Sequence, residues 1–183
     1  MRSRKPAPPL DESSLYNYAV RLLGQQMRTV AELKRLLRRR IEPGPAGEEA
    51  LARVVARLTE YKFLDDTGYA REFARLRQQN SSFGRRRVQQ DLMRKGVRAE
   101  VIAQTLDAAY EGVPEEALAR RHLERRRIAK PSTQKEAARV ARLLLRAGFS
   151  PGTVFRILKQ WDVEDAALAA IESLAADEQP PQE

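Results

Sequence analysis

Two arginine-rich stretches hold the side chains of this sequence that are most able to do chemistry. In the first stretch, helical spacing puts Val88 and Leu92 on one face and most of the basic side chains on the other. The second stretch, which begins at Leu118, has the same pattern. Guanidinium groups in such rows bind phosphates or carboxylates through paired hydrogen bonds. The candidate contacts for a partner or for DNA are Arg85, Arg86, Arg87, Arg94, Lys95, Arg98, Arg120, Arg121 and Arg127, with Arg125 and Arg126 at the edge of the second row. The alternative is a solvated face whose single charges contribute little.

The residues that could serve catalysis or hold a metal have simpler structural roles. Asp65 and Asp66 precede an expected helix, where carboxylates cap exposed backbone amides, and neighbouring side chains point in different directions. His122 lies among apolar residues of its helix, so we expect a partly buried structural histidine. The chain has no Cys and one His, which leaves a zinc site almost without ligands. Glycine-rich phosphate loops and nucleophile elbows are also missing. We therefore expect no enzymatic activity, no cofactor and no metal.

The composition favours a helical fold. The 183 residues are 42% hydrophobic and 32% charged, which is enough apolar material for a core under a heavily charged surface. Aromatic content of 6% and nine Gly argue against a turn-rich all-β sandwich or barrel. No apolar run approaches the ~18 residues of a membrane span, and the N-terminus lacks the apolar core of a signal peptide. These features predict a cytoplasmic protein that does not insert into membranes.

The charge is distributed unevenly along the chain. Seven acidic residues and no Lys or Arg follow Trp161. Leaving these seven acids out of the net charge of +9 gives +16 for residues 1–161, which suits a polyanionic partner. The acidic tail could fold back over the basic surface and compete with that partner. Alternatively, residues 163–176 could form a capping helix on the last structural unit, since Leu168, Ile171 and Leu174 recur at helical spacing.

Local signals mark where the expected helices begin and end. Pro43 and Pro45 predict a loop over residues 42–47, and the spacing of Ile102, Leu106 and Tyr110 predicts a helix over 99–110. Helix starts are indicated by Thr29 with Glu32, Thr133 with Glu136, and Ser150 with Pro151. Helix ends are indicated by Gly96 and Gly148. We expect Phe83 to dock between repeats with Gly84 permitting the turn, and Trp161 to be a core residue.

An internal repeat organises the chain. Residues 92–97 match residues 144–149 at an offset of 52, and a fainter copy precedes both. Each copy accounts for about three helices and is too small to bury much apolar surface alone, so the copies should stack on one another. The expected fold is all-α, with three tandem three-helix repeats in an elongated, curved array. The expected segments are a mobile lead-in 1–14, repeats 15–64, 65–112 and 113–161, and an acidic, partly helical extension 162–183.

The central residues resemble a known family. The segment FLDDTGYAREF, residues 63–73, and the segment FGRRRVQQDLMRKGV, residues 83–97, are similar to the centre of the bacterial RecX regulatory proteins. That family carries a Phe/Trp-Leu-Asp-Asp stretch, a Phe-Gly stretch and a Leu-x-x-Lys-Gly-Ile/Val close. The flanking repeats fit as well, so the resemblance covers about residues 15–161. The Pro-rich loop of the first repeat and the long tail depart from the pattern.

The resemblance implies a function. It implies an all-α regulator that binds the RecA recombinase filament on single-stranded DNA and restrains filament growth, strand exchange and ATP hydrolysis, without being an enzyme. We also expect weak, non-specific binding to single-stranded DNA, with duplex DNA left open as a second target, and a monomeric chain. The alternative is a helix-turn-helix DNA-binding protein, which would concentrate its base contacts on one recognition helix and commonly dimerise.

Overall fold

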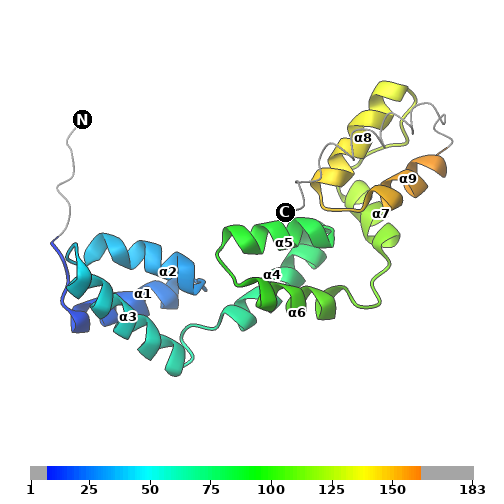
Figure 1. The fold of residues 1–183 in the computed structure, drawn as a ribbon. Helices are drawn as coiled ribbons and strands as arrows, with labels where there is room; N and C mark the ends of the chain where they lie inside the picture. Colours follow the sequence, from blue (N-terminus) through cyan, green and yellow to red (C-terminus); the bar gives the residue numbers. More distant parts are fainter. Residues whose placement is uncertain (1–7, 162–183) are drawn as a thin grey trace, which may run out of the picture. The chain divides into compact units, whose positions relative to one another are not determined.

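The computed structural model describes residues 8–161, and within this range every regular element is a helix (Figure 1). The elements are α1 (Glu12–Gln25), α2 (Val30–Leu37), a short 3-10 helix (Arg38–Arg40), α3 (Pro45–Glu60), α4 (Asp66–Ser81), α5 (Arg85–Arg94), α6 (Ala99–Tyr110), α7 (Glu115–Arg125), α8 (Gln134–Arg146) and α9 (Pro151–Lys159). The expected all-α class is confirmed. These α-helices fall three to each expected repeat range, and the division into three repeats stays a prediction. The acidic extension 162–183 lies outside the described residues.

Several helix starts follow the expected capping patterns. Thr29 forms the full capping box with Glu32: its hydroxyl accepts the Glu32 N–H, and the Glu32 carboxylate accepts the Thr29 N–H. Ser150 caps α9 by accepting the N–H of Thr153, with Pro151 at the first helical position. The box expected at Thr133 is only half formed. Thr133 accepts the Glu136 N–H, but the Glu136 carboxylate binds Ser132 instead.

Two expected boundaries differ from the structure. The loop expected over residues 42–47 is shorter, because α3 already begins at Pro45. A proline is tolerated at the first helical position, where its missing N–H would have no partner inside the helix. The expected lead-in over residues 1–14 also ends earlier. Leu10 donates its N–H to the Arg40 carbonyl, and Asp11 caps α1 by accepting the N–H of Ser14.

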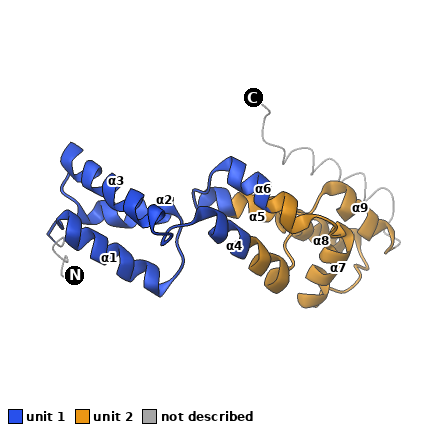
Figure 2. Cartoon of the chain, turned by 90° about the horizontal axis from the view of Figure 1, so that it is seen from below, with its two compact units in different colours: residues 1–72, 92–105 blue, residues 73–91, 106–183 orange. Residues whose placement is uncertain are grey.

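The chain forms two compact units (Figure 2). Among the described residues, unit 1 comprises 8–72 and 92–105, and unit 2 comprises 73–91 and 106–161. The chain therefore passes between the units inside α4, α5 and α6. Neither unit is one continuous segment of sequence.

Each unit has a hydrophobic core. In unit 1, helices α1, α2 and α3 pack around leucines that are almost fully inaccessible to solvent; the core residues are Leu15, Ala19, Leu33, Leu37, Leu51, Val54, Val55, Leu58 and Leu64. In unit 2, α7, α8 and α9 enclose a second core; its residues are Leu118, Ala119, Leu123, Val140, Ala141, Leu144, Ala147, Phe149, Val154, Ile157 and Leu158. Trp161, expected in the core, is half-buried against this second cluster.

In each unit, a residue just before a helix donates a hydrogen bond to a carbonyl in the turn between two other elements. In unit 1, the hydroxyl of Thr29, just before α2, donates to the carbonyl of Lys95 in the turn between α5 and α6 over 2.6 Å. A side chain on Gly96 would collide with Ala31. In unit 2, the N–H of Gly84, just before α5, donates to the carbonyl of Ala147 in the turn between α8 and α9 over 2.8 Å. A helix start thus packs against the turn that precedes another helix.

Glycines permit the contact in unit 2. A Cβ on Gly84 would overlap the backbone of Gly148, and a Cβ on Gly148 would overlap the backbone of Arg87. Gly148 also has φ of +90°, in the left-handed region that favours glycine. The sequence predicts that Gly84 permits a turn. In the structure Gly84 has no positive φ, and its missing side chain instead allows two backbone segments to approach closely.

Candidate nucleic-acid and partner interface

The basic face of α5 is largely as expected. Val88 and Leu92 are fully buried, while Arg85, Arg86 and Arg94 are exposed. The Arg85 guanidinium lies 2.6 Å from a carboxylate oxygen of Asp107, an exposed ion pair that contributes little to stability. Helical periodicity alone was sufficient to place these three arginines at the surface.

Arg87 differs from the expectation of an outward position. Its side chain is only 36% exposed, and its Nε lies 3.4 Å from a carboxylate oxygen of Asp91. Its guanidinium also lies 5.7 Å from the centre of the Phe83 ring. The backbone of Arg87 packs directly against Gly148. Arg87 is therefore anchored to unit 2 by both its backbone and its side chain.

Lys95 is likewise held by its neighbours. Its Nζ lies 2.6 Å from a Glu32 carboxylate oxygen and 5.8 Å from the centre of the Tyr69 ring. The hydrogen bond to Glu32 raises the pKa of Lys95 above its ordinary value, although partial burial opposes the rise. Because Glu32 also completes the cap of α2, Lys95 ties the α5–α6 turn to that helix start.

The second basic row lies on α7 and just after it. Arg121 is exposed, and so is Arg127, which has φ of 53°. Arg120 lies 3.1 Å from a Glu116 carboxylate oxygen. Arg125 is exposed, and its guanidinium donates to the Gln79 carbonyl over 3.3 Å. This row therefore mixes outward cations with local ion pairs.

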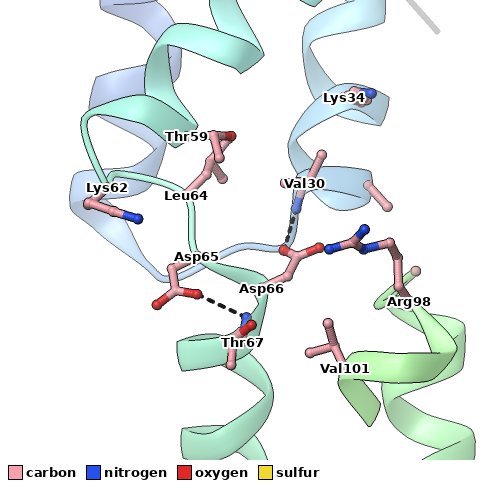
Figure 3. A pocket seen from close by; sticks show the side chains of 12 residues that line it. Val30, Lys34, Thr59, Lys62, Leu64, Asp65, Asp66, Thr67, Arg98 and Val101 are labelled. Carbon is pink, nitrogen blue, oxygen red and sulfur yellow. Dashed lines mark hydrogen bonds between the residues drawn. The ribbon is translucent and has the colours of Figure 1, made fainter. Parts of the chain in front are cut away.

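A pocket of about 540 Å³ opens in unit 1 beside Asp65 and Asp66 (Figure 3). Asp65 caps α4 as expected, because one of its carboxylate oxygens accepts the N–H groups of Thr67 and Gly68. The expectation that Asp66 also caps its own helix is wrong. Asp66 accepts the N–H of Val30, the first residue of α2, over 2.9 Å. It thus satisfies a backbone donor of a helix 36 residues earlier in the sequence.

The electrostatics of Asp66 follow from this position. Burial raises the pKa of the carboxyl above its ordinary value, and the Val30 N–H and the Arg98 charge oppose that rise without cancelling it. Arg98, which is exposed at the start of α6, points its guanidinium toward Asp66 (Figure 3). Asp65 and Asp66 are both hydrogen-bonded to backbone amides. No cluster of three residues able to hold a metal ion occurs within residues 8–161.

A basic hollow of about 230 Å³ lies in unit 2. Its lining residues are Phe83, Arg87, His122, Arg126, Leu143, Arg146 and Ala147. Phe83, from the expected docking segment, is half-buried against the core of this unit. Arg146 was absent from the sequence-based candidates, although the offset of 52 pairs it with Arg94. That pairing was the available signal.

His122, expected to be a partly buried structural histidine, lines this hollow and is almost fully buried. It is 2% exposed, and its ring packs between Phe83 and Phe149 at centroid distances of 5.7 and 5.9 Å. Its Nδ1 lies 2.8 Å from the Ser81 carbonyl. A carbonyl only accepts, so Nδ1 carries the proton. Burial lowers the pKa of His122 below its ordinary value, against the effect of the Ser81 hydrogen bond.

Comparison with known proteins decides the family. A family model described as the second three-helix domain of RecX matches residues 65–106. The regulatory protein RecX of Mycolicibacterium smegmatis is 33% identical over 156 residues, which cover 82% of this chain and 81% of that protein. The chain belongs to the RecX family. The RecX protein of Thermobifida fusca is 32% identical over 144 residues, which cover 77% of this chain and 75% of that protein.

Solved structures agree on the fold. The crystal structure of RecX from Lactobacillus salivarius matches with a TM-score of 0.67 and 22% identity, covering 83% of this chain and 97% of that one.

RecX proteins are regulatory proteins, so this chain is a regulator and not an enzyme. None of the helices in residues 8–161 is long and apolar enough to span a membrane.

Proposed function

We propose that this RecX-family chain binds RecA filaments on single-stranded DNA and inhibits their extension, ATP hydrolysis and strand exchange. The observation that carries the proposal is the 33% identity to a curated RecX protein over 82% of the chain. The match of residues 65–106 to the second RecX three-helix domain adds to it. We also propose three tandem repeats, a monomeric chain, and weak DNA binding without sequence preference.

The distribution of charge supports a polyanionic partner. Exposed arginines lie on α5, in the α5–α6 turn, and on and just after α7, and they include Arg86, Arg94, Arg98, Arg121 and Arg127. Contacts spread over several elements suit a repetitive polymer, whereas a helix-turn-helix protein concentrates its contacts on one helix. A repetitive partner requires no sequence-specific base contacts from this surface.

The first test is the rate of ATP hydrolysis by RecA. Adding this protein in substoichiometric amounts to RecA on single-stranded DNA should lower ATP turnover, because a filament regulator acts on many RecA subunits at once. The protein alone should hydrolyse no ATP. Turnover that stays constant across the whole concentration range would refute the proposal. Strong preference for one duplex sequence would favour the helix-turn-helix alternative.

A second prediction concerns the exposed arginines of α5. The double substitution Arg86→Ala with Arg94→Ala should weaken binding to oligo-dT and inhibition of RecA severalfold. Each lost phosphate contact should also lower the salt dependence of single-strand binding by about 0.7 in the log–log slope. Because both side chains are exposed, the free energy of unfolding should change by less than about 1 kcal/mol.

The matched control removes the same charge elsewhere. Arg35 and Arg39 are exposed and stand outside the candidate rows, so Arg35→Ala with Arg39→Ala should have a smaller effect on binding. Binding curves at several salt concentrations, together with thermal melts of both variants, show whether the α5 arginines contact the nucleic acid. Equal losses in the two variants would mean that only the total charge matters, and a large loss of stability with intact binding would make the α5 arginines structural.

A further inference from the structure

The hollow in unit 2 carries an excess of positive charge. Three of its seven lining residues, Arg87, Arg126 and Arg146, are arginines, and none is acidic. Asp91 is the acid beside Arg87, and it is shared, with one oxygen 3.4 Å from Arg87 and the other 3.8 Å from Arg77. One carboxylate therefore faces two guanidiniums. The local charge stays positive and favours an anionic ligand.

The guanidinium groups keep unused donors. The Nε of Arg87 is buried beside Asp91 at 3.4 Å, so the donors that Arg87 offers to a ligand are those of its two terminal nitrogens. Arg146 uses its Nε on the Arg142 carbonyl. The Arg126 side chain has no hydrogen bond or ion pair with any residue in the range 8–161. Each guanidinium has five N–H donors, so several remain for a ligand.

The shape of the hollow favours a phosphate over a carboxylate. A planar carboxylate is satisfied by one bidentate arginine, whereas the oxygens of a phosphate can be approached by several guanidiniums from different sides. The remaining walls are apolar or aromatic, from Phe83, Leu143 and Ala147. Such walls suit the sugar or base attached to a phosphate.

The surroundings favour a polymer over an isolated ion. Further exposed arginines on and beside α7 and α8 are Arg121, Arg125, Arg127, Arg139 and Arg142. They could contact neighbouring phosphates of the same strand. A single strand is flexible enough to turn one phosphate into a hollow, whereas the backbone of a duplex is held in a regular helix.

We propose that the hollow lined by Arg87, Arg126 and Arg146 binds a backbone phosphate of single-stranded nucleic acid, with the attached sugar or base against Phe83 and Leu143. This inference rests on the proposed DNA binding, which it assigns to a particular site. It requires no contact with RecA.

The test compares two double substitutions that remove equal charge. Arg126→Ala with Arg146→Ala removes two walls of the hollow, and Arg35→Ala with Arg39→Ala removes two exposed arginines that belong neither to the hollow nor to the candidate rows. With labelled oligo-dT near physiological salt, the first double should bind at least about tenfold more weakly, as expected for lost charge-assisted hydrogen bonds, and the control only about twofold. Thermal melts of both variants should match the wild type.

A second measurement detects a ligand in the hollow by nuclear magnetic resonance. His122 is the chain's only histidine and lines the hollow, so its ring proton resonance should shift on titration with inorganic phosphate and with oligo-dT. The Arg126→Ala with Arg146→Ala variant should lose both shifts, while the control double keeps them.

The outcomes separate this inference from the proposed function. Equal loss of oligo-dT affinity in the two doubles would overturn the phosphate site. So would a shift of the His122 resonance by a poly-glutamate peptide and not by oligo-dT, because the occupant would then be an acidic protein. In either case inhibition of RecA by the wild-type chain would be unaffected, since the ATP turnover assay tests it independently.

Discussion

Replacing Gly148 by alanine should destabilise unit 2 strongly. Gly148 has φ of +90°, and its missing side chain leaves room for the backbone of Arg87. The left-handed conformation costs an L-residue about 1 to 2 kcal/mol, and overpacking adds about 1 to 3 kcal/mol, so the free energy of unfolding should fall by roughly 3 kcal/mol. Chemical denaturation followed by circular dichroism measures this change.

Gly152 provides the matched control. It lies four residues further along, in the first turn of α9, and the nearest group to its missing Cβ is the flexible end of Arg156 at 3.7 Å. Gly152→Ala should therefore leave the free energy of unfolding within about 1 kcal/mol of the wild type. If Gly148→Ala behaved like this control, the close contact between the α8–α9 turn and the start of α5 would be incorrect.

His122→Ala should have a comparably large effect. The substitution removes a side chain that is 2% exposed and packed between two phenylalanines, and it leaves the Ser81 carbonyl without its hydrogen bond. Large-to-small changes in a core cost about 2 to 5 kcal/mol, and we expect a loss of about 3 kcal/mol. A loss below about 1 kcal/mol, as is usual for surface positions, would contradict the buried placement.

The same residue should make stability depend on pH. His122 has a lowered pKa in the folded state, because burial disfavours the charged ring and the nearby charges of Arg125 and Arg126 disfavour it as well. As the pH falls below the ordinary value of 6.5, the unfolded chain binds a proton that the folded chain resists. The stabilisation is thus complete above that value and is lost as the pH falls toward the folded pKa. His122→Gln should flatten the stability profile between about pH 7 and pH 5, and an unchanged profile would rule out this origin.

Features set by neighbours in sequence could be predicted well. The helix over Ala99–Tyr110 has the expected bounds, and the capping box at Thr29 and the Ser150-Pro151 start are formed. Gly96 and Gly148 both take the expected positive φ. Each of these signals acts over one or two helical turns, so the local sequence carries the whole of the physical cause.

Features set by distant contacts could not be predicted. The hydrogen bond from Val30 to Asp66 spans 36 residues, and the one from Thr29 to Lys95 spans 66. Periodicity places Lys95 on a surface but says nothing of the carboxylate that meets it there. The same limit applies to the hollow in unit 2, where residues from three helices converge and only the repeat offset indicated Arg146.

The division of α4, α5 and α6 between the units bears on the order in which the chain can fold as it is synthesised. The core of unit 1 is formed entirely by residues up to Leu64, so it can assemble while the remainder is still being translated. The contact of Thr29 with Lys95 has to wait until the α5–α6 turn has left the ribosome. When Leu64 has emerged, the start of α2 still lacks both partners, and Asp66 becomes available well before Lys95 does. During translation, the first hydrophobic core can therefore form before the hydrogen bonds that join the start of α2 to Asp66 and Lys95.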